Sequence, residues 1–294
     1  MAELPFTGGY SPIRHRKGTD LVLLKSANDF RIKKLRTIVL FDAECNMNNG
    51  RMGKEAMHLA LDNNLIAPEQ YSRPNRKAID HALNRRLMFD YFAMRKRPFS
   101  MTSCDLAGCY DRVIHSAISL ALQRVGISQD NIASMCGTLQ QMIHVVRTAF
   151  GDSTSTIGGE DWGQYLLPCM GVFQGNKAGP PIWAIISSTI FDALRKQGYG
   201  VSFCSAISAL TFRLCGFAFV DDSDLIADGD TAEAAHLKMQ ETITCWEGII
   251  AATGGAMAPV KSWWYLVDFD WDKGRWKFKN AGEHKQLFAH DADN

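Results

Sequence analysis

The sequence predicts a mixed α/β (α+β) fold, with a sheet that is covered by helices on one side. Three observations support this prediction. The chain has 294 residues, of which 46% are hydrophobic and 21% charged, so it can bury a sizeable core. Strand-like and helix-like patterns alternate along the chain, which excludes all-α and all-β folds. We find no internal repeat and no low-complexity segment.

The N-terminal part is expected to begin with a mobile leader. Residues 1–24 combine glycines, prolines and a basic cluster at Arg14–Lys17 without hydrophobic periodicity. Residues 36–41 (RTIVLF) form a short β-branched run that predicts a strand. Residues 46–50 (NMNNG) predict the turn that ends it, so we expect the next helix to begin near Met52.

A long amphipathic helix is predicted over residues 76–97, and Pro98 ends it. Residues 99–106 predict a buried strand, and the helix after it ends at Gly126. Apolar residues recur every three or four positions on the first helix at Ile79, Leu83, Leu87, Tyr91 and Met94, and on the second at Ile114, Ile118, Leu122 and Val125.

The second half continues the alternation. Residues 151–164 are rich in Gly, Ser, Thr and Asp and predict a loop or hairpin tip. Pro180-Pro181 opens an apolar helix that ends near Gly198. Residues 212–220 and 223–226 predict two strands that meet in a tight turn.

Two further elements complete the chain. Thr231 is expected to cap a helix that runs to about Ala252. Residues 264–278 predict a hairpin with aromatic flanks and a turn at Gly274.

Charge is unevenly distributed, although the formal net charge is only +1. Between Arg31 and Arg97 there are 14 Lys or Arg against 7 Asp or Glu, whereas residues 221–230 contain five Asp. A basic half and an acidic spot suit an enzyme that handles phosphates. The alternative is that the basic residues from Arg85 to Arg97 are only the solvated face of a helix.

Cysteine and histidine spacing indicates no zinc site. The eight cysteines include no C-x-x-C pair and are expected to be reduced core thiols. The eight histidines are expected to be structural or surface residues. No signal-like start and no apolar run of about 18 to 20 residues is present, which predicts an intracellular protein, cytoplasmic or nuclear, without a membrane partner.

Two acidic elements could carry chemistry. Asp105 follows the predicted strand over 99–106, with Tyr110 five positions later. Asp221-Asp222 lies at the turn between two strands, where adjacent carboxylates repel each other unless a cation lies between them. Mg²⁺ fits, because it takes oxygen ligands. Taken alone, the pair could also belong to an ordinary type I turn, in which Asp is favoured by local hydrogen bonding.

If the strands of Asp105 and Asp221 lie side by side, their carboxylates can hold two ions about 3.5 to 4 Å apart for nucleotidyl transfer. The order of motifs favours this interpretation. Phe173-Gln174-Gly175, followed by Gly179-Pro180-Pro181, lies between the two acidic elements and opens a helix.

The series resembles motifs A, B and C of the reverse transcriptase palm. The resemblance implies a right-hand polymerase palm, an antiparallel sheet backed by helices, with a fingers subdomain. It also implies two Mg²⁺ ions, or Mn²⁺, bound by Asp105, Asp221 and Asp222. Tyr110 is similar to the aromatic gate that excludes a ribose 2′-hydroxyl, and Gln174-Gly175 to the Gln-Gly of motif B, which contacts the dNTP.

The resemblance extends outward from the palm motifs. Arg36 is similar to the fingers residue that grips the triphosphate, with Lys33 or Lys34 as its companion. Gln70-Tyr71 resembles the fingers segment that touches the template. Lys261 is similar to the motif D lysine that protonates the leaving pyrophosphate, although an exposed lysine at a strand end is an equal alternative.

The resemblance implies fingers over residues 25–98, a palm over 99–265, a primer-grip-like hairpin over 266–280 and a tail over 281–294. A thumb is expected to be absent, as in one portion of a retroelement polyprotein or a truncated copy.

The expected activity is that of an RNA-directed DNA polymerase, which extends a primer on an RNA or DNA template with dNTPs, with flanking domains as possible partners. A viral RNA-dependent RNA polymerase is disfavoured by Val220 and Gln174-Gly175. An inactive relic that binds nucleic acid stays open.

Overall fold

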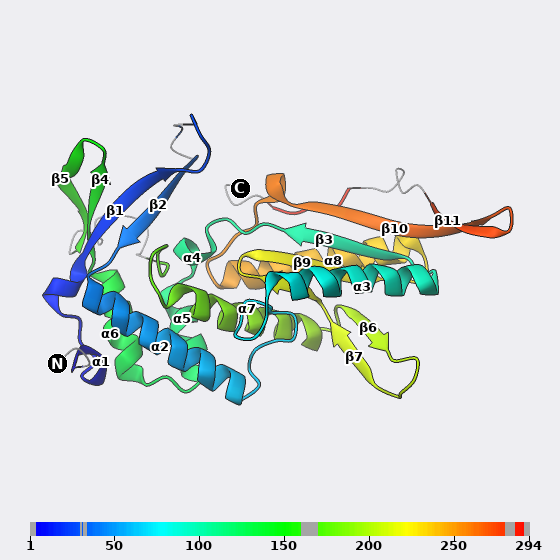
Figure 1. Ribbon diagram of the computed structural model, residues 1–294, viewed down its shortest axis with the longest axis horizontal. Helices are drawn as coiled ribbons and strands as arrows, with labels where there is room; N and C mark the ends of the chain where they lie inside the picture. The colour runs from blue at the N-terminus through cyan, green and yellow to red at the C-terminus, as the bar shows by residue number, and fades with distance from the viewer. Residues whose placement is uncertain (1–3, 30, 32–33, 160–169, 280–285, 291–294) are drawn as a thin grey trace. The chain divides into compact units, whose positions relative to one another are not determined.

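The computed structural model divides into two compact units, which Figure 1 shows with their elements labelled. Unit 1 comprises residues 1–64 and 110–185, and unit 2 comprises residues 65–109 and 186–294. Helices α4 (Cys109–Arg112) and α7 (Gly179–Lys196) include residues of both units. The structure describes residues 4–29, 31, 34–159, 170–279 and 286–290.

Unit 1 is built on a mixed sheet with the strand order β2-β1-β4-β5. The β1 strand pairs antiparallel with β2 and parallel with β4, and β4 pairs antiparallel with β5. The strands are β1 (Lys17–Leu24), β2 (Leu35–Leu40), β4 (Ile143–Thr148) and β5 (Gly151–Gly158). The helices are α1 (Leu4–Thr7), α2 (Ala43–Asp62), α5 (His115–Arg124) and α6 (Gln129–Gln140), with the 3-10 helix η1 (Ile13–Arg16).

Two expectations for unit 1 are wrong. Residues 4–24 were expected to lie in a mobile leader, but they form α1, η1 and β1. Residues 151–158, expected in a loop or hairpin tip, form β5 instead. The β1 strand pairs with the distant strand β4, and β5 pairs with the preceding strand β4, so strand pairing rather than local composition orders both segments.

The α2 helix also begins earlier than predicted, at Ala43 rather than near Met52. The Asp42 carboxylate caps it by accepting hydrogen bonds from the backbone N–H groups of Glu44 and Cys45. The asparagines of residues 46–50 do not form a turn. Asn46 uses its side-chain amide instead, because its Nδ2 donates to the Gly175 carbonyl and its Oδ1 accepts from the Lys177 N–H.

Unit 2 is built on an antiparallel sheet with the strand order β11-β10-β3-β9-β8. The strands are β3 (Phe99–Cys104), β8 (Gly216–Phe219), β9 (Asp222–Asp228), β10 (Trp263–Asp272) and β11 (Arg275–Lys279), with a separate hairpin of β6 (Val201–Cys204) and β7 (Thr211–Leu214). The helices are α3 (Ala78–Arg95) and α8 (Ala232–Ala252), with the 3-10 helix η4 (Pro259–Lys261).

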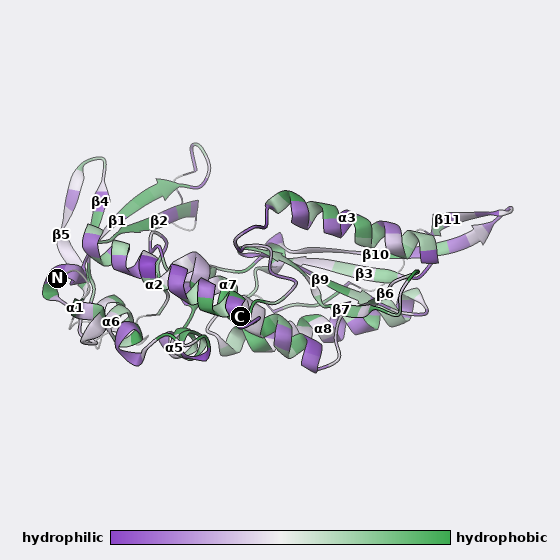
Figure 2. Cartoon of the chain, turned by 60° about the horizontal axis from the view of Figure 1, so that its bottom comes forward, coloured by the Kyte–Doolittle hydropathy of each residue, from purple (hydrophilic) through white to green (hydrophobic). Residues whose placement is uncertain are grey.

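Helices cover both faces of this sheet, not one as expected. Met101 packs in a core cluster with Met88 and Phe92 of α3. Leu266 of β10 pairs with Ser100, which points to the opposite face, and Leu266 packs against Ala232 and Ala235 of α8. Figure 2 shows α3 and α8 on opposite sides of β3, β9 and β10.

The buried stripe of α3 differs from the predicted one. Ile79, Leu83 and Leu87 are exposed, and so is Met94, whereas Met88 and Phe92 are buried. Both stripes satisfy helical spacing. The Phe92 ring stacks on Phe99 at 4.5 Å between ring centroids, so the large aromatic contact decides which stripe is buried.

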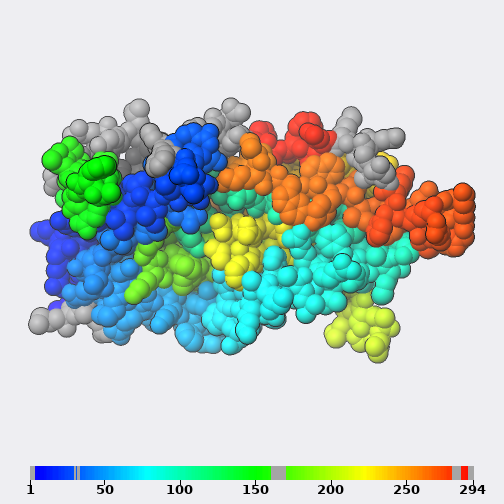
Figure 3. Space-filling view, turned by 45° about the horizontal axis from the view of Figure 1, so that its top comes forward, coloured from blue at the N-terminus to red at the C-terminus, as the bar shows by residue number. Residues whose placement is uncertain are grey.

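Several predicted elements of unit 2 are confirmed. Thr231 caps α8, because its side-chain oxygen accepts a hydrogen bond from the Ala234 N–H. The hairpin predicted over residues 264–278 is formed by β10 and β11, and every residue of β11 is exposed. Figure 3 shows the orange-to-red end of this hairpin at the surface. The family-derived boundary at residue 280 lies just outside the described residues.

Cysteines in the described residues are free thiols. Cys45, Cys104, Cys109 and Cys215 are buried, which agrees with core thiols, but Cys204 is exposed. Burial raises the pKa of the Cys45 thiol to about 12. Within the part of the chain that the structure describes, no helix combines the length and apolarity needed to cross a membrane.

Candidate active site

The turn between β8 and β9 presents the predicted acidic pair in unit 2. Phe219 pairs with Asp222, so Val220 and Asp221 form the tight turn between the two strands. Val220 has a φ of 58°, which is unfavourable for a β-branched residue. The pairing of the two strands holds this strained turn in place, and it sets Asp221 at the tip and Asp222 at the start of β9.

Asp105 lies at the same end of the sheet. Cys104, the last residue of β3, pairs with Ser223 of β9, and Asp105 follows directly. The Asp105 N–H donates to Ser262 Oγ at 3.1 Å, and its carbonyl accepts from the Ala258 N–H at 2.9 Å. The strands that carry Asp105 and the Asp221-Asp222 turn therefore lie side by side, which is the condition the sequence left open. We call Asp105, Asp221 and Asp222 the aspartate cluster.

The members of the aspartate cluster affect one another's charge. The pKa of Asp222 is raised, first by partial burial and then by the negative charges of Asp221, Asp105 and Asp224. His81 acts in the opposite direction but does not offset these effects. A raised carboxyl pKa means that the ionised form is disfavoured, and a bound cation would relieve that cost.

Lys261 provides a positive charge beside Asp105. Its Nζ lies 2.9 Å from Asp105 Oδ2, and the Lys261 side chain is 63% exposed. The resemblance to reverse transcriptases implies that these two residues share one site, and the structure brings them into contact. An exposed ion pair of this kind contributes little to stability, so the ammonium group can leave Asp105 at low cost.

A layer of residues behind the aspartate cluster was missed by sequence reasoning. Asp224 lies two positions after Asp222, on the same face of β9, and it is buried. Its Oδ2 lies 3.2 Å from Arg85 Nη1 and 3.6 Å from His81 Nε2. Arg85 also donates to the Tyr265 hydroxyl at 2.7 Å. Two patterns in the sequence could have revealed this layer. Asp222 and Asp224 are two positions apart, as residues on one face of a strand are, and His81 and Arg85 are four positions apart, as residues on one face of a helix are.

The aspartate cluster fits Mg²⁺ or Mn²⁺ in the type of its donors. Carboxylate oxygens are the ligands these ions prefer, and mutual repulsion leaves the cluster in need of positive charge. Among the described residues, however, the three aspartates do not bring one oxygen each within 4.8 Å of one another. The three carboxylates therefore lie at the same end of the sheet, but their oxygens are not close enough to coordinate one ion together.

Unit 1 carries the other predicted residues. The Gln174 carbonyl accepts from the Val39 N–H of β2 at 2.8 Å. Gly175 has a φ of 111°, and a Cβ there would lie 2.2 Å from the Val39 carbonyl oxygen, so this position requires glycine. The motif B-like loop is therefore fastened to β2, the strand that carries Arg36.

Of the other predicted residues of unit 1, Tyr110 lies beside the segment that leads into the Gln174 loop, whereas Arg36 and Lys34 are exposed. The Tyr110 carbonyl accepts from the Val172 N–H at 2.7 Å, just before the Gln174 loop. Arg36 and Lys34 are exposed, and Lys34 immediately precedes β2. Lys33, the other companion considered, lies outside the described residues.

One family-derived expectation holds only in part. The side chains of Gln70 and Tyr71 are buried and cannot contact a template, whereas Arg73 and Arg76, which follow them in the same segment, are not buried. Gln70 Nε2 donates to Ser187 Oγ at 2.7 Å, and the Tyr71 hydroxyl accepts from Asn84 Nδ2 at 2.9 Å. These residues link the segment before α3 to the core of unit 2.

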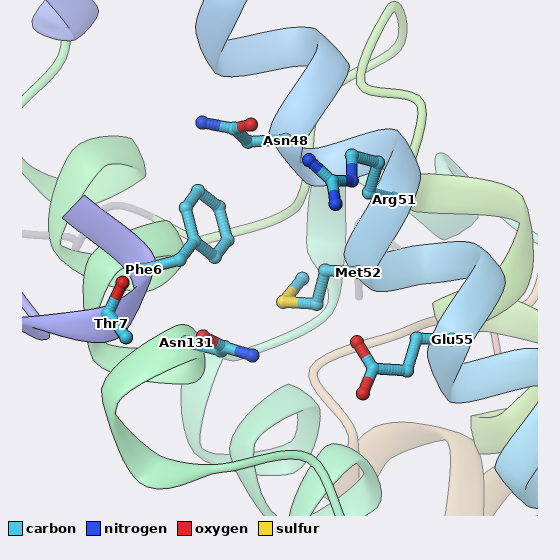
Figure 4. Close-up of a pocket in the computed structure, with 7 residues that line it drawn as sticks. All are labelled: Phe6, Thr7, Asn48, Arg51, Met52, Glu55 and Asn131. Carbon is cyan, nitrogen blue, oxygen red and sulfur yellow. The ribbon is translucent and has the colours of Figure 1, made fainter. Parts of the chain in front are cut away.

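Unit 1 contains a cavity of about 240 Å³ that is lined by other residues than those of the predicted motifs. Side chains of α2 line it together with residues of α1 and α6, as Figure 4 shows. The lining consists of Phe6, Thr7, Asn48, Arg51, Met52, Glu55 and Asn131, and includes none of the predicted site residues.

Comparison with known proteins gives structural matches only. The sequence matches no protein-family model and no curated protein. Telomerase from Candida tropicalis, truncated from its C-terminal domain, matches with a TM-score of 0.55 and 13% identity over 90% of this chain and 55% of that one. Telomerase from Candida albicans, in complex with a TWJ fragment of telomeric RNA, matches with a TM-score of 0.54 and 12% identity over 86% of this chain and 42% of that one.

The chain thus spans about half the length of these solved structures. At such low identity the likeness concerns the fold alone. Telomerase is a reverse transcriptase, and the chain therefore has a reverse transcriptase-like fold.

Proposed function

We propose that this chain is an RNA-directed DNA polymerase of retroelement origin, which extends a primer 3′ end with dNTPs. One observation carries the proposal. The antiparallel register of β3 and β9 pairs Cys104 with Ser223, which sets Asp105 beside the Asp221-Asp222 turn. In this proposal the five-stranded sheet of unit 2 is the palm, and the β10–β11 hairpin is its primer grip.

The aspartate cluster would hold two Mg²⁺ ions, or Mn²⁺, through its carboxylate oxygens. When bound, such ions activate the attacking hydroxyl and stabilise the leaving pyrophosphate. Lys261 would donate a proton to that leaving group. Its contact with Asp105 Oδ2 and its exposure support this role, since the ammonium group lies close to the cluster and can leave the ion pair to reach a substrate.

Unit 1 would supply the contacts to the nucleotide. Arg36 and Lys34 would bind the triphosphate, and the Tyr110 ring would exclude a ribose 2′-hydroxyl. Gln174 and Gly175 would line the dNTP site. The hydrogen bond between Gln174 and Val39 supports this grouping, because it ties the loop to the strand of Arg36.

The partners of the proposed activity are a primer and an RNA or DNA template. The solved Candida telomerases include complexes with telomeric RNA fragments, which supports a nucleic-acid partner here. Because the chain matches only about half of those structures, flanking domains are proposed as further partners that grip the duplex.

A second candidate is a nucleic-acid-binding protein without catalysis. Two observations favour it: Lys261 occupies one oxygen of Asp105, and the three aspartates are not gathered within 4.8 Å among the described residues. The same fold would then serve binding only.

The test is primer extension on an RNA template with a labelled DNA primer, dNTPs and Mg²⁺ or Mn²⁺. We compare the wild-type chain with Asp221→Asn and with Asp62→Asn, which removes the same charge at an exposed position of α2. Loss of several kcal/mol of transition-state stabilisation predicts a rate at least about 10³-fold lower in Asp221→Asn. The Asp62→Asn rate should be unchanged.

Equal extension by wild type and Asp221→Asn would overturn the proposed site. Binding of primer–template by wild type, with no extension at any Mg²⁺ or Mn²⁺ concentration, would support the second candidate instead.

A further inference from the structure

A second group of metal-ligating side chains lies in unit 1. His15 of η1, Asp42 at the N-cap of α2 and Glu44 in its first turn bring one ligand atom each within 4.8 Å of one another. Among the described residues this is the one group of three or more His, Cys, Asp or Glu side chains that closes so tightly. We call it the His15 cluster.

The imidazole of His15 is buried and incompletely paired. His15 is 1% exposed, and its Nε2 has no hydrogen-bond partner among the described residues. Nε2 lies 3.6 Å from Asp42 Oδ1 and 4.0 Å from Glu44 Oε2, too far for hydrogen bonds. An unpaired buried polar atom costs about 1 to 3 kcal/mol, so this nitrogen needs a partner.

The protonation state of His15 suits a metal ligand. Burial lowers the pKa of His15, and this effect outweighs the attraction of Asp42 and Glu44 for the proton. Burial thus favours the neutral imidazole, which can offer a lone pair on one ring nitrogen.

The two carboxylates are held in place before any ion binds. Asp42 Oδ1 accepts from the N–H groups of Glu44 and Cys45, which fixes the carboxylate and leaves the lone pairs of Oδ2 to bind an ion. Glu44 Oε2 forms an ion pair with Arg14 Nη2 at 2.5 Å. Arg14 is 62% exposed, so its guanidinium can be displaced at little cost.

We propose that His15, Asp42 and Glu44 form a binding site for a divalent transition-metal ion of the Zn²⁺ type. One imidazole nitrogen and two carboxylate oxygens make a mixed donor set that Zn²⁺ accepts, whereas Mg²⁺ and Ca²⁺ prefer oxygen alone. Tetrahedral Zn²⁺ with bonds of about 2.0 to 2.2 Å places its donors about 3.4 Å apart. The observed separations of 3.6 and 4.0 Å lie close to that value.

The bound ion would fasten η1 to the N-terminus of α2 and leave one coordination position for water. The site belongs entirely to unit 1 and shares no residue with the aspartate cluster. The inference therefore stands independently of the proposed polymerase activity.

The test measures Zn²⁺ binding by the full-length, chelator-treated chain, in competition with a chromophoric chelator. The variants are His15→Gln and Glu44→Gln, and the matched control is His58→Gln, which changes an exposed histidine of α2. We expect one site whose affinity falls at least about 30-fold in the two cluster variants. Affinity should be unchanged in His58→Gln.

A further variant keeps the test decisive if a cluster variant fails to fold. Arg14→Gln removes the competing guanidinium without touching a ligand, so it should bind Zn²⁺ more tightly than wild type. Zn²⁺ should also raise the thermal unfolding midpoint of wild type and Arg14→Gln. The proposal is overturned if wild type shows no saturable Zn²⁺ site, or if neither His15→Gln nor Arg14→Gln changes the affinity.

Discussion

The two acidic clusters differ in how their donors are gathered. The aspartate cluster of unit 2 combines two neighbouring residues of one turn with a residue at the end of the adjacent strand. Its three carboxylates do not bring one oxygen each within 4.8 Å of one another. The His15 cluster of unit 1 joins a histidine of η1 to two acidic residues at the start of α2, and its ligand atoms lie within 4.8 Å of one another.

The difference shows what each kind of site demands of the fold. In the aspartate cluster, partial burial and then the negative charges of neighbouring aspartates raise the pKa of Asp222, and a bound cation would relieve both costs. In the His15 cluster, Arg14 forms an ion pair with Glu44, and its positive charge reduces the repulsion between the two carboxylates. Sequence motifs reveal the first arrangement readily and the second hardly at all.

The largest expected effect comes from the loop that supports the His15 cluster. Gly175 and its neighbours bind Val39 and Asn46, on either side of Asp42. Gly175→Ala should lower the free energy of unfolding by at least about 2 kcal/mol, because a Cβ would collide with the Val39 carbonyl at a φ of 111°. Urea unfolding measures the loss, which should be accompanied by weaker Zn²⁺ binding.

A matched control for that prediction is Gly151→Ala. Gly151 has a φ of 117°, but no heavy atom lies within 4 Å of a Cβ there. Its cost should be limited to backbone strain, about 1 kcal/mol. Equal losses for the two variants would mean that the contact with Val39 is unimportant.

A smaller effect is expected at the aspartate cluster from Lys261→Arg. Arginine keeps the positive charge beside Asp105 but does not release a proton at working pH. If Lys261 protonates the leaving group, kcat for primer extension should fall about tenfold or more, with little change in KM. Lys238→Arg, at the ion pair with Asp228, is the control and should retain full kcat. An unchanged kcat in Lys261→Arg would exclude the proton-donor role.

The smallest effects are those of pH on stability, and they have opposite signs in the two clusters. The pKa of His15 is lowered in the folded chain, so the stability present above 6.5 is lost as pH falls below that value. The pKa of Asp222 is raised above 3.8, so stability is regained as pH falls through the raised value.

Urea unfolding from pH 7 to pH 4 in metal-free buffer checks these signs. The stability of wild type relative to His15→Gln should fall on acidification, and that of wild type relative to Asp222→Asn should rise. Since Asp222 is largely exposed, its contribution should be only a few tenths of a kcal/mol, roughly, after solvent screening. The same sign in both comparisons would contradict the assigned causes.

Much of unit 2 could be predicted from sequence because its signals are local. The helix cap at Thr231, the stop at Pro98 and the Asp221-Asp222 turn each depend on a few consecutive residues. The order of strand, helix and hairpin around Asp105 followed from the same short-range periodicity.

What the sequence by itself determined was therefore the type and order of most elements, and the candidate metal ligands of the aspartate cluster. The tertiary structure decided which strands pair, which stripe of α3 is buried, and that His15 meets Asp42 and Glu44. The physical reason is that periodicity specifies a local conformation, whereas burial and pairing depend on neighbours that are distant in the chain. Residues as separate in sequence as β1 and β4 become partners only when the sheet forms.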